Sequence, residues 1–153
     1  IRFGGHRSAA GLTIARDQVA PFAQRFNAVA LETLTAADLV PELRTDLELP
    51  FDSATAQLES LLRHLEPCGV GNPSPVLVSR GVVLGAPPKA VGKDGLRLVL
   101  QGGGHTLPAI GWGMAARRGE LSTGQPIDVA FRLDRDEWHG ESRLQVRLAD
   151  FRS

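Results

Sequence analysis

The amino-acid sequence predicts an α+β chain in which a partly helical first half leads into a small β-barrel. Two observations carry this prediction. Up to residue 75, apolar residues recur at helical spacing in two segments. From Val76 onward, short runs of alternating apolar and polar residues are separated by glycine-rich or charged turns. With 153 residues, of which 42% are hydrophobic and 22% charged, the chain can bury a core without disulfides.

The first half is expected to hold two helices. Residues 17–31 form the first, with an apolar face made of Val19, Phe22, Phe26 and Val29. Alternation over residues 43–49 indicates a strand. The second helix should begin at a cap, Asp52 or Ser53, and end at residues 66–67. Its apolar face comprises Ala54, Leu58, Leu61, Leu62 and Leu65.

The second half is expected to hold five strands, at residues 76–84, 96–101, 106–112, 127–134 and 143–151. Turns should separate them at residues 85–95, 102–105 and 135–142, with one helical connector near residues 114–121. Five short strands with one helical excursion suit a five-stranded OB-type β-barrel.

Composition narrows the class of protein. The single cysteine, Cys68, excludes an internal disulfide, and no apolar run approaches about 18 residues, so we expect a cytoplasmic protein with no membrane partner. The start lacks a signal-peptide pattern and opens inside a motif, from which we expect a fragment. Net charge is zero, but residues 1–73 carry a balance of −3 and residues 74–153 one of +3. The second half could therefore follow a phosphate backbone.

Gly4, Gly5 and His6 form the first candidate site. Two glycines allow successive backbone N–H groups to line an anion-binding nest, and the residues from His6 to Ala10 can open a short helix. The N-terminus of such a helix favours a phosphate, and His6 can add a hydrogen bond. On spacing alone, a Gly-Gly turn with a satisfied histidine is the favoured interpretation. Residues 9–15 should then end in a short β-like stretch.

The outer face of the barrel is the second candidate. Arg143, Gln145 and Arg147 alternate with apolar residues, so one face of that strand should be buried and the other basic and polar. Arg97 stands in a similar pattern. Further candidates lie in a loop and at a hairpin tip: Lys89, Lys93 and Trp138. Single-strand binders stack bases and follow phosphates with such residues. An ordinary solvated sheet face accounts for the pattern equally well.

Other residues receive a structural interpretation. Trp112 is expected in the core or at the rim of the barrel, and residues 102–105 in a flexible hairpin turn. Cys68 is interpreted as a buried or incidental thiol, because no second cysteine or base lies near it in sequence. A solvated polar turn, rather than a metal site, is expected at Asp134, Asp136 and Glu137. No complete active site is assembled, so we expect no catalytic residue and no bound metal in this chain.

Several runs resemble known families. Residues 2–14 resemble the end of the DHHA1 domain of the DHH phosphoesterase superfamily. Residues 65–76 resemble the linker that leads into the OB domain of RecJ exonucleases. Shorter matches to that family follow at residues 91–95, 109–115, 136–140 and 144–146. The resemblance runs from residue 2 to residue 151 in one register.

The resemblance implies a parent enzyme that degrades single-stranded DNA from its 5′ end in repair and recombination, with Mn²⁺ or Mg²⁺ held in a preceding domain. It implies that Gly4, Gly5, His6 and Arg7 bind a DNA phosphate near the scissile bond, and that the OB face holds DNA further along. Single-stranded DNA, a single-strand-binding protein and a helicase would be the partners. Two positions depart from the family: Cys68 replaces an aromatic residue, and near Val99, where the family carries a basic residue, this chain offers Arg97 instead.

The resemblance divides the chain into residues 1–40, the end of the DHHA1 domain, and residues 41–153, the OB domain, whose helical segment 41–75 leads into the barrel. We expect the isolated chain to bind single-stranded DNA weakly and not to hydrolyse it. One alternative is an OB module that contacts a protein, with the Gly-Gly-His element merely structural. Another is a DHH-family phosphoesterase that acts on short oligonucleotides or RNA.

Overall fold

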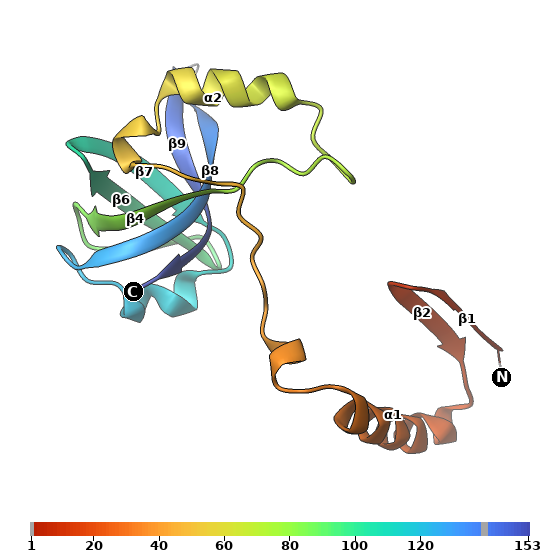
Figure 1. The fold of residues 1–153 in the computed structure, drawn as a ribbon. Helices are drawn as coiled ribbons and strands as arrows, with labels where there is room; N and C mark the ends of the chain where they lie inside the picture. The colour runs from red at the N-terminus through yellow and green to blue at the C-terminus, as the bar shows by residue number, and fades with distance from the viewer. Residues whose placement is uncertain (1, 139–140) are drawn as a thin grey trace. The chain divides into compact units, whose positions relative to one another are not determined.

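The computed structural model describes residues 2–138 and 141–153 (Figure 1). Its contacts divide the chain into a first unit that ends at Glu42 and a second unit, Leu43–Ser153. No helix in the described part of the chain is long and apolar enough to cross a membrane.

The first unit is a β-hairpin followed by a helix. Strands β1 (Arg2–His6) and β2 (Ala9–Thr13) pair in antiparallel fashion, the 3₁₀ helix η1 spans Arg16–Gln18, and helix α1 spans Val19–Thr33. A second 3₁₀ turn, η2, covers Ala37–Leu39. The expected helix and the β-like stretch are confirmed. Pro21 lies in the first turn of α1, where its missing N–H has no intrahelical partner to lose.

The short helix expected from His6 to Ala10 is wrong, because both segments are strands. His6 pairs with Ala9 and Gly5 with Ala10, which leaves residues 7–8 as a tight turn. The close approach of the two strands explains why residue 5 is a glycine. A Cβ on Gly5 would lie 2.8 Å from the Ala9 carbonyl oxygen and 2.9 Å from Ala10 Cα.

Helical segments also open the second unit. Strand β3 (Leu47–Glu48), the 3₁₀ turn η3 (Phe51–Ser53), helix α2 (Ala56–Leu62) and the 3₁₀ turn η4 (Arg63–Leu65) follow in order. The expected strand is thus only two residues long. The expected cap at residues 52–53 is wrong, because Thr55 caps α2 through its hydroxyl, which accepts from the Leu58 N–H at 3.2 Å.

Six further strands build the barrel. They are β4 (Leu77–Leu84), β5 (Lys89–Val91), β6 (Gly95–Gly102), β7 (His105–Gly111), β8 (Pro126–Trp138) and β9 (Glu141–Arg152), with the 3₁₀ helix η5 (Ala115–Glu120) between β7 and β8. The sheet order is β3-β4-β8-β9-β7-β6-β5, and β4 also pairs with β6. This extra pairing closes a ring of five strands, β4-β8-β9-β7-β6, in which β7 and β9 run parallel.

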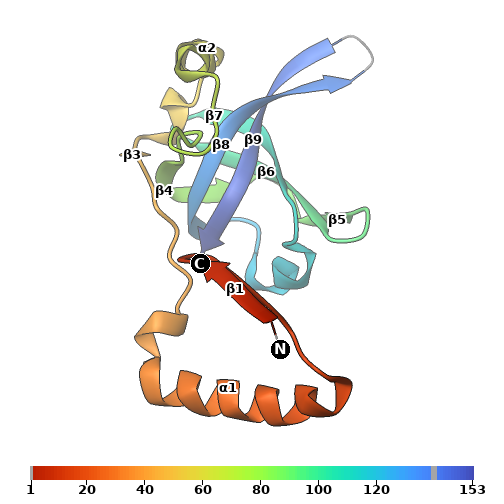
Figure 2. The same cartoon turned by 90° about the vertical axis from the view of Figure 1, so that its right-hand side faces the viewer.

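The five expected strands and the hairpin at 102–105 are confirmed. Strand β5 lies within residues 85–95, where only a turn was expected, so that prediction was incomplete. The expected turn 135–142 is wrong, because β8 continues to Trp138 and β9 begins at Glu141. Figure 2 shows these two strands extending beyond the rest of the sheet. Charged residues pair across this ribbon, Asp136 opposite Arg143 for example, so its sequence has the polarity of a turn.

Inward-facing residues of the ring form one core. Leu96 and Leu98 on β6 and Val146 on β9 are almost fully buried, and Phe131 packs its ring edge-on against Phe51 at a centroid distance of 6.2 Å. Alternation along each strand turns the intervening side chains outward. The polar residues considered below therefore lie on the outer surface of a closely packed barrel.

Candidate nucleic-acid interface

A row of basic side chains crosses the outer face of the sheet. Lys89 on β5 lies opposite Arg97 on β6, and Arg97 lies opposite Ile110 on β7. Ile110 is in turn paired with Arg147 on β9, and Arg147 with Arg132 on β8. Residues paired across neighbouring strands point to the same face. We call Lys89, Arg97, Arg147 and Arg132 the basic row.

A shallow groove of about 170 Å³ lies along this row. It brings together three of the residues that the sequence singled out, Arg97, Gln145 and Arg147. The other residues that line it are Val91, Ile110, Trp112, Asp134 and Asp136. The groove thus combines two guanidinium groups, a primary amide, an indole ring and two carboxylates. Guanidinium groups are well suited to phosphate, and the aromatic ring to a flat apolar group.

The groove's arginines are weakly compensated within the protein. Arg147 Nη1 lies 3.8 Å from Asp134 Oδ2, and both side chains are at least half exposed, so this ion pair contributes little to stability. Within residues 2–138 and 141–153, no ion pair is found for Lys89, Lys93 or Arg97. Their charges remain available to an anionic ligand.

Other predicted residues lie near the groove or beyond it. Lys89 is part of β5 rather than of a loop, and Lys93 is exposed in the turn between β5 and β6. Arg143 is exposed on β9, opposite Asp136. Trp138 is the last residue of β8; its side chain, like residues 139 and 140, lies outside the described part of the chain.

The Gly-Gly-His element forms neither the Gly-Gly turn that the sequence favoured nor the alternative anion nest, because it lies in an extended strand. Gly4, Gly5 and His6 are the last three residues of β1, and Arg7 follows in the turn. All four are exposed in the first unit. Since no helix begins at His6, the helix-terminus argument for phosphate binding does not apply, and any phosphate contact there would come from a strand end and a hairpin turn.

Trp112 lies at one of the two places expected from the sequence, the core or the rim, but its place in the lining of the groove was not predicted. It is 54% exposed at the end of β7 and lines the groove, so it lies at the barrel rim rather than in the core. Its neighbours could have indicated this, because Gly111 and Gly113 flank it and Gly113 adopts a φ of 73°. Glycines on both sides are unusual for a tryptophan packed inside a continuous strand.

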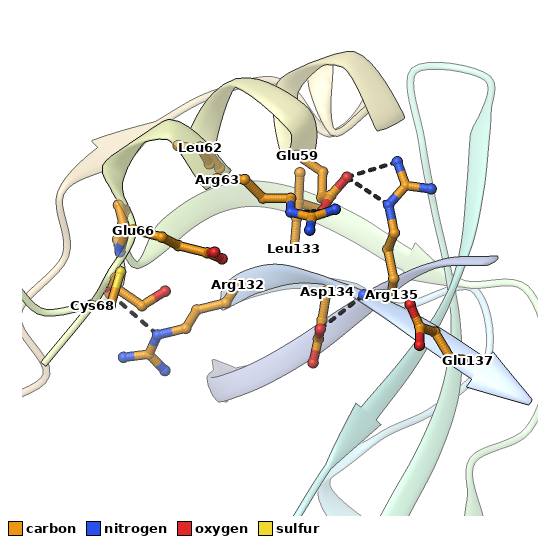
Figure 3. A pocket seen from close by; sticks show the side chains of 12 residues that line it. Glu59, Leu62, Arg63, Glu66, Cys68, Arg132, Leu133, Asp134, Arg135 and Glu137 are labelled. Atoms are coloured by element: carbon orange, nitrogen blue, oxygen red, sulfur yellow. Dashed lines mark hydrogen bonds and ion pairs between the residues drawn. The ribbon is translucent and has the colours of Figure 1, made fainter. Parts of the chain in front are cut away.

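A second hollow of about 330 Å³ lies between α2, the segment 66–75 and β8 (Figure 3). Glu59, only 5% exposed, accepts hydrogen bonds from Arg135 at 2.8 Å, and Arg63 lies 4.0 Å from its other oxygen. Arg132 donates to the Ser74 carbonyl at 3.3 Å. These contacts fasten the helical segment to the barrel. Because four carboxylates line this hollow against three guanidinium groups, while the groove has two of each, the hollow is a poorer site for a polyanion than the groove.

Metal binding finds no support in the described residues. Across residues 2–138 and 141–153, no three His, Cys, Asp or Glu side chains are grouped so that they could hold an ion. Asp134 and Asp136 lie on strand β8 and not in the expected turn. Cys68 is exposed, which excludes the buried alternative for this thiol and leaves the incidental one. Among the described residues we find no set of side chains that fits Mn²⁺ or Mg²⁺, and we assign no metal-dependent step to them.

The closed ring of five strands, with a parallel pair and a helical connector, defines an OB-type barrel domain. A family model of the RecJ OB domain matches residues 45–150, and the chain belongs to that family. It is 26% identical to the single-stranded-DNA-specific exonuclease RecJ of Bacillus subtilis over 97% of the chain, and 30% identical to that of Dickeya dadantii over 97%. The chain spans 19% and 26% of the length of these relatives.

A solved structure agrees with this assignment. The crystal structure of RecJ from Thermus thermophilus in complex with Mg²⁺ matches all of the chain with a TM-score of 0.75 at 27% identity. The matched part is 23% of the Thermus chain.

Proposed function

We propose that this chain is the single-stranded-DNA-binding portion of a 5′-to-3′ exonuclease of the RecJ type, a hydrolase of phosphodiester bonds used in DNA repair and recombination. The basic row is the observation that carries the proposal. From β5 to β9 it crosses three strand spacings, roughly 14 Å, so it can contact more than one phosphate of a single strand. Lys89, Arg97 and Arg147 would hold these phosphates.

The OB-type barrel would act as a clamp on the strand. Phosphate contacts supply most of the affinity and carry no sequence information, which suits an exonuclease that must accept any sequence. Asp134 and Asp136 temper the positive charge of the groove and, with the neutral net charge of the chain, support weak rather than tight binding.

The first unit would belong to a different domain. We assign residues 1–40 to the end of a DHHA1 domain and residues 41–153 to the OB domain with its helical lead-in. Gly4, Gly5, His6 and Arg7 would contact a phosphate near the scissile bond. Support comes from the relatives, which match 97% of the chain and therefore include this region.

Catalysis would take place outside this chain. Structures of the Thermus RecJ hold Mg²⁺ or Mn²⁺, and a preceding domain of the parent enzyme would bind the corresponding ion. The chain alone would be inactive. As part of the same proposal, the parent enzyme works in the bacterial cytoplasm, where a single-strand-binding protein and a helicase would supply its substrate.

Fluorescence anisotropy tests the proposal. A 5′-labelled single-stranded 20-mer and its duplex are titrated with the chain, and we expect salt-sensitive binding to the single strand alone. Arg97→Glu and Arg147→Glu should each weaken it at least tenfold. Arg44→Glu is a matched control, because it makes the same charge change at an exposed residue outside the basic row. Affinity unchanged by the groove variants would favour a barrel that contacts a protein partner instead.

A further inference from the structure

We infer that Trp112 is a stacking platform for one base of the bound strand, in the same groove whose residues Arg97 and Arg147 hold phosphates. This inference rests on the proposed binding of single-stranded DNA and assigns a role that the basic row alone does not. Phosphate contacts fix the backbone of a strand, and a stacked base adds a second, independent source of affinity.

Exposure of the indole is the first observation. Among the side chains that the structure describes between residues 76 and 153, Trp112 is the only large apolar one that is exposed. The other large apolar side chains described there are buried or partly buried. An exposed tryptophan leaves apolar area in water with no gain for the fold, whereas a flat ligand would cover it.

The indole ring also packs against the backbone of the neighbouring chain segment. Trp112 follows the β7 residue that pairs with Leu96, so it lies across from Gly95. A Cβ on Gly95 would lie 2.9 Å from Trp112 Cζ3 and 3.1 Å from Cε3, which shows that the six-membered ring packs directly against the Gly95 backbone. Glycine at position 95 makes room for this contact.

The backbone after Trp112 is fastened as well. The Ala115 N–H donates to the Asp94 carbonyl at 3.0 Å, which ties the start of η5 to the turn before β6. Arg117 in η5 donates to the Phe151 carbonyl at 2.9 Å, and its guanidinium lies 4.0 Å from the Phe151 ring centroid. A ring that packs against Gly95 and precedes a fastened backbone segment loses little conformational freedom when a ligand covers its exposed side.

The surroundings of the ring match one nucleotide. At about 170 Å³, the groove is smaller than typical small-molecule pockets, so it suits a flat group lying on the surface better than an engulfed ligand. Ile110 adds apolar contact, and the Gln145 amide carries both donors and an acceptor, so it can bond to the edge of any base. Such a site would select for a base without selecting its identity.

Two readouts test the inference on the full 153-residue chain. First, oligo-dT should quench tryptophan emission with the same midpoint as anisotropy, and Trp112→Phe, which leaves Trp138 as the only tryptophan, should lose most of that quenching. Second, Trp112→Ala should weaken oligo-dT binding roughly 5- to 150-fold, as expected for one stacked base, while Trp112→Phe keeps most of the affinity.

An abasic 20-mer separates stacking from charge. It keeps the phosphates and lacks the bases, so wild type and Trp112→Ala should bind it equally, while Arg97→Glu still weakens it. Equal affinity of Trp112→Ala and wild type for oligo-dT, or binding without quenching, would overturn the stacking inference and leave the proposed function intact. Absence of binding to both oligo-dT and the abasic strand would overturn both. If Trp112→Ala does not fold, the fluorescence quenching measured with wild type and Trp112→Phe still tests the stacking inference.

Discussion

Lys89 and Arg97 lie directly opposite each other on β5 and β6, and no carboxylate forms an ion pair with either within the described residues. Like charges in this arrangement destabilise a sheet. Arg147 opposite Arg132 is a second pair of like charges in the same row, although Arg147 also lies 3.8 Å from Asp134. A protein with no anionic ligand gains nothing from this arrangement, whereas a bound phosphate would turn the repulsion into attraction for both members of a pair.

Removing one charge of the pair should therefore change stability and binding in opposite directions. Lys89→Gln should raise the free energy of unfolding by about 0.2–1 kcal/mol, since the cross-strand repulsion is lost. The same variant should bind single-stranded DNA more weakly. Urea denaturation and anisotropy measure the two effects. A variant that loses both stability and affinity would contradict the interpretation of Lys89 as a ligand-directed charge.

The pair of Glu59 and Arg135 should matter to folding and not to DNA. Glu59→Ala removes the partner of Arg135 and opens a small cavity, so we expect a loss of about 1–3 kcal/mol, less than for a fully buried pair because Arg135 is partly exposed. Replacing both residues by methionine should recover much of the loss, because, among the ion pairs of the described residues, the only charge that then loses a partner is that of Arg63, whose side chain is 61% exposed. Chemical denaturation of the single and double variants checks this.

Acid should weaken the barrel through Asp128. A hydrogen bond from Arg152 lowers the pKa of Asp128 below its ordinary value of 3.8, and the Gly81 N–H and Arg80 act in the same direction. The folded state thus favours the ionised form, which stabilises the barrel above pH 3.8 and loses its effect as the pH falls below that value through the folded pKa. Asp128→Asn should be less stable than wild type at pH 7, and the difference should shrink by pH 3 in thermal denaturation. A constant difference would contradict this assignment.

Substitutions at the neighbouring residues Gly4 and Gly5 can distinguish a structural role of the first unit from a role in ligand binding. Gly5→Ala should disrupt the hairpin, because the new Cβ would meet the Ala9 carbonyl oxygen at 2.8 Å. Gly4→Ala has open space around it and should leave the hairpin intact. Amide exchange of Ala9 and Ala10 reports on the hairpin. Should Gly4→Ala preserve protection and yet weaken DNA binding, the proposed phosphate contact would gain direct support; unchanged binding would count against it.

Local patterns predicted much of the barrel. Alternation around Arg97 and Arg147 correctly placed these residues on the outer face, because a strand with one buried side has a period of two. The sequence could not predict that Arg97, Trp112 and Gln145 lie together in one groove. This arrangement depends on the parallel pairing of β7 with β9, which joins segments more than 30 residues apart and leaves no local pattern.

Predictions from local sequence failed in segments whose conformation is determined by pairing with another strand. The charged stretch around Asp136 has the composition of a turn, yet it forms a ladder with β9 because its partners there carry complementary side chains. Gly4-Gly5-His6 has the composition of an anion nest, yet pairing with Ala9–Thr13 holds it extended. In both cases the isolated segment had several accessible conformations, and a partner strand selected one.

The salt dependence of single-strand binding tests the central claim most directly. For wild type, Arg97→Gln and the control Arg63→Gln, the logarithm of the association constant for oligo-dT is plotted against the logarithm of salt concentration. Because each phosphate contact on a single strand contributes about 0.7 to the slope, Arg97→Gln should reduce the magnitude of the slope by about that amount, while Arg63→Gln leaves it unchanged. Identical slopes for all three proteins, or binding without salt dependence, would contradict a basic row that grips the DNA backbone.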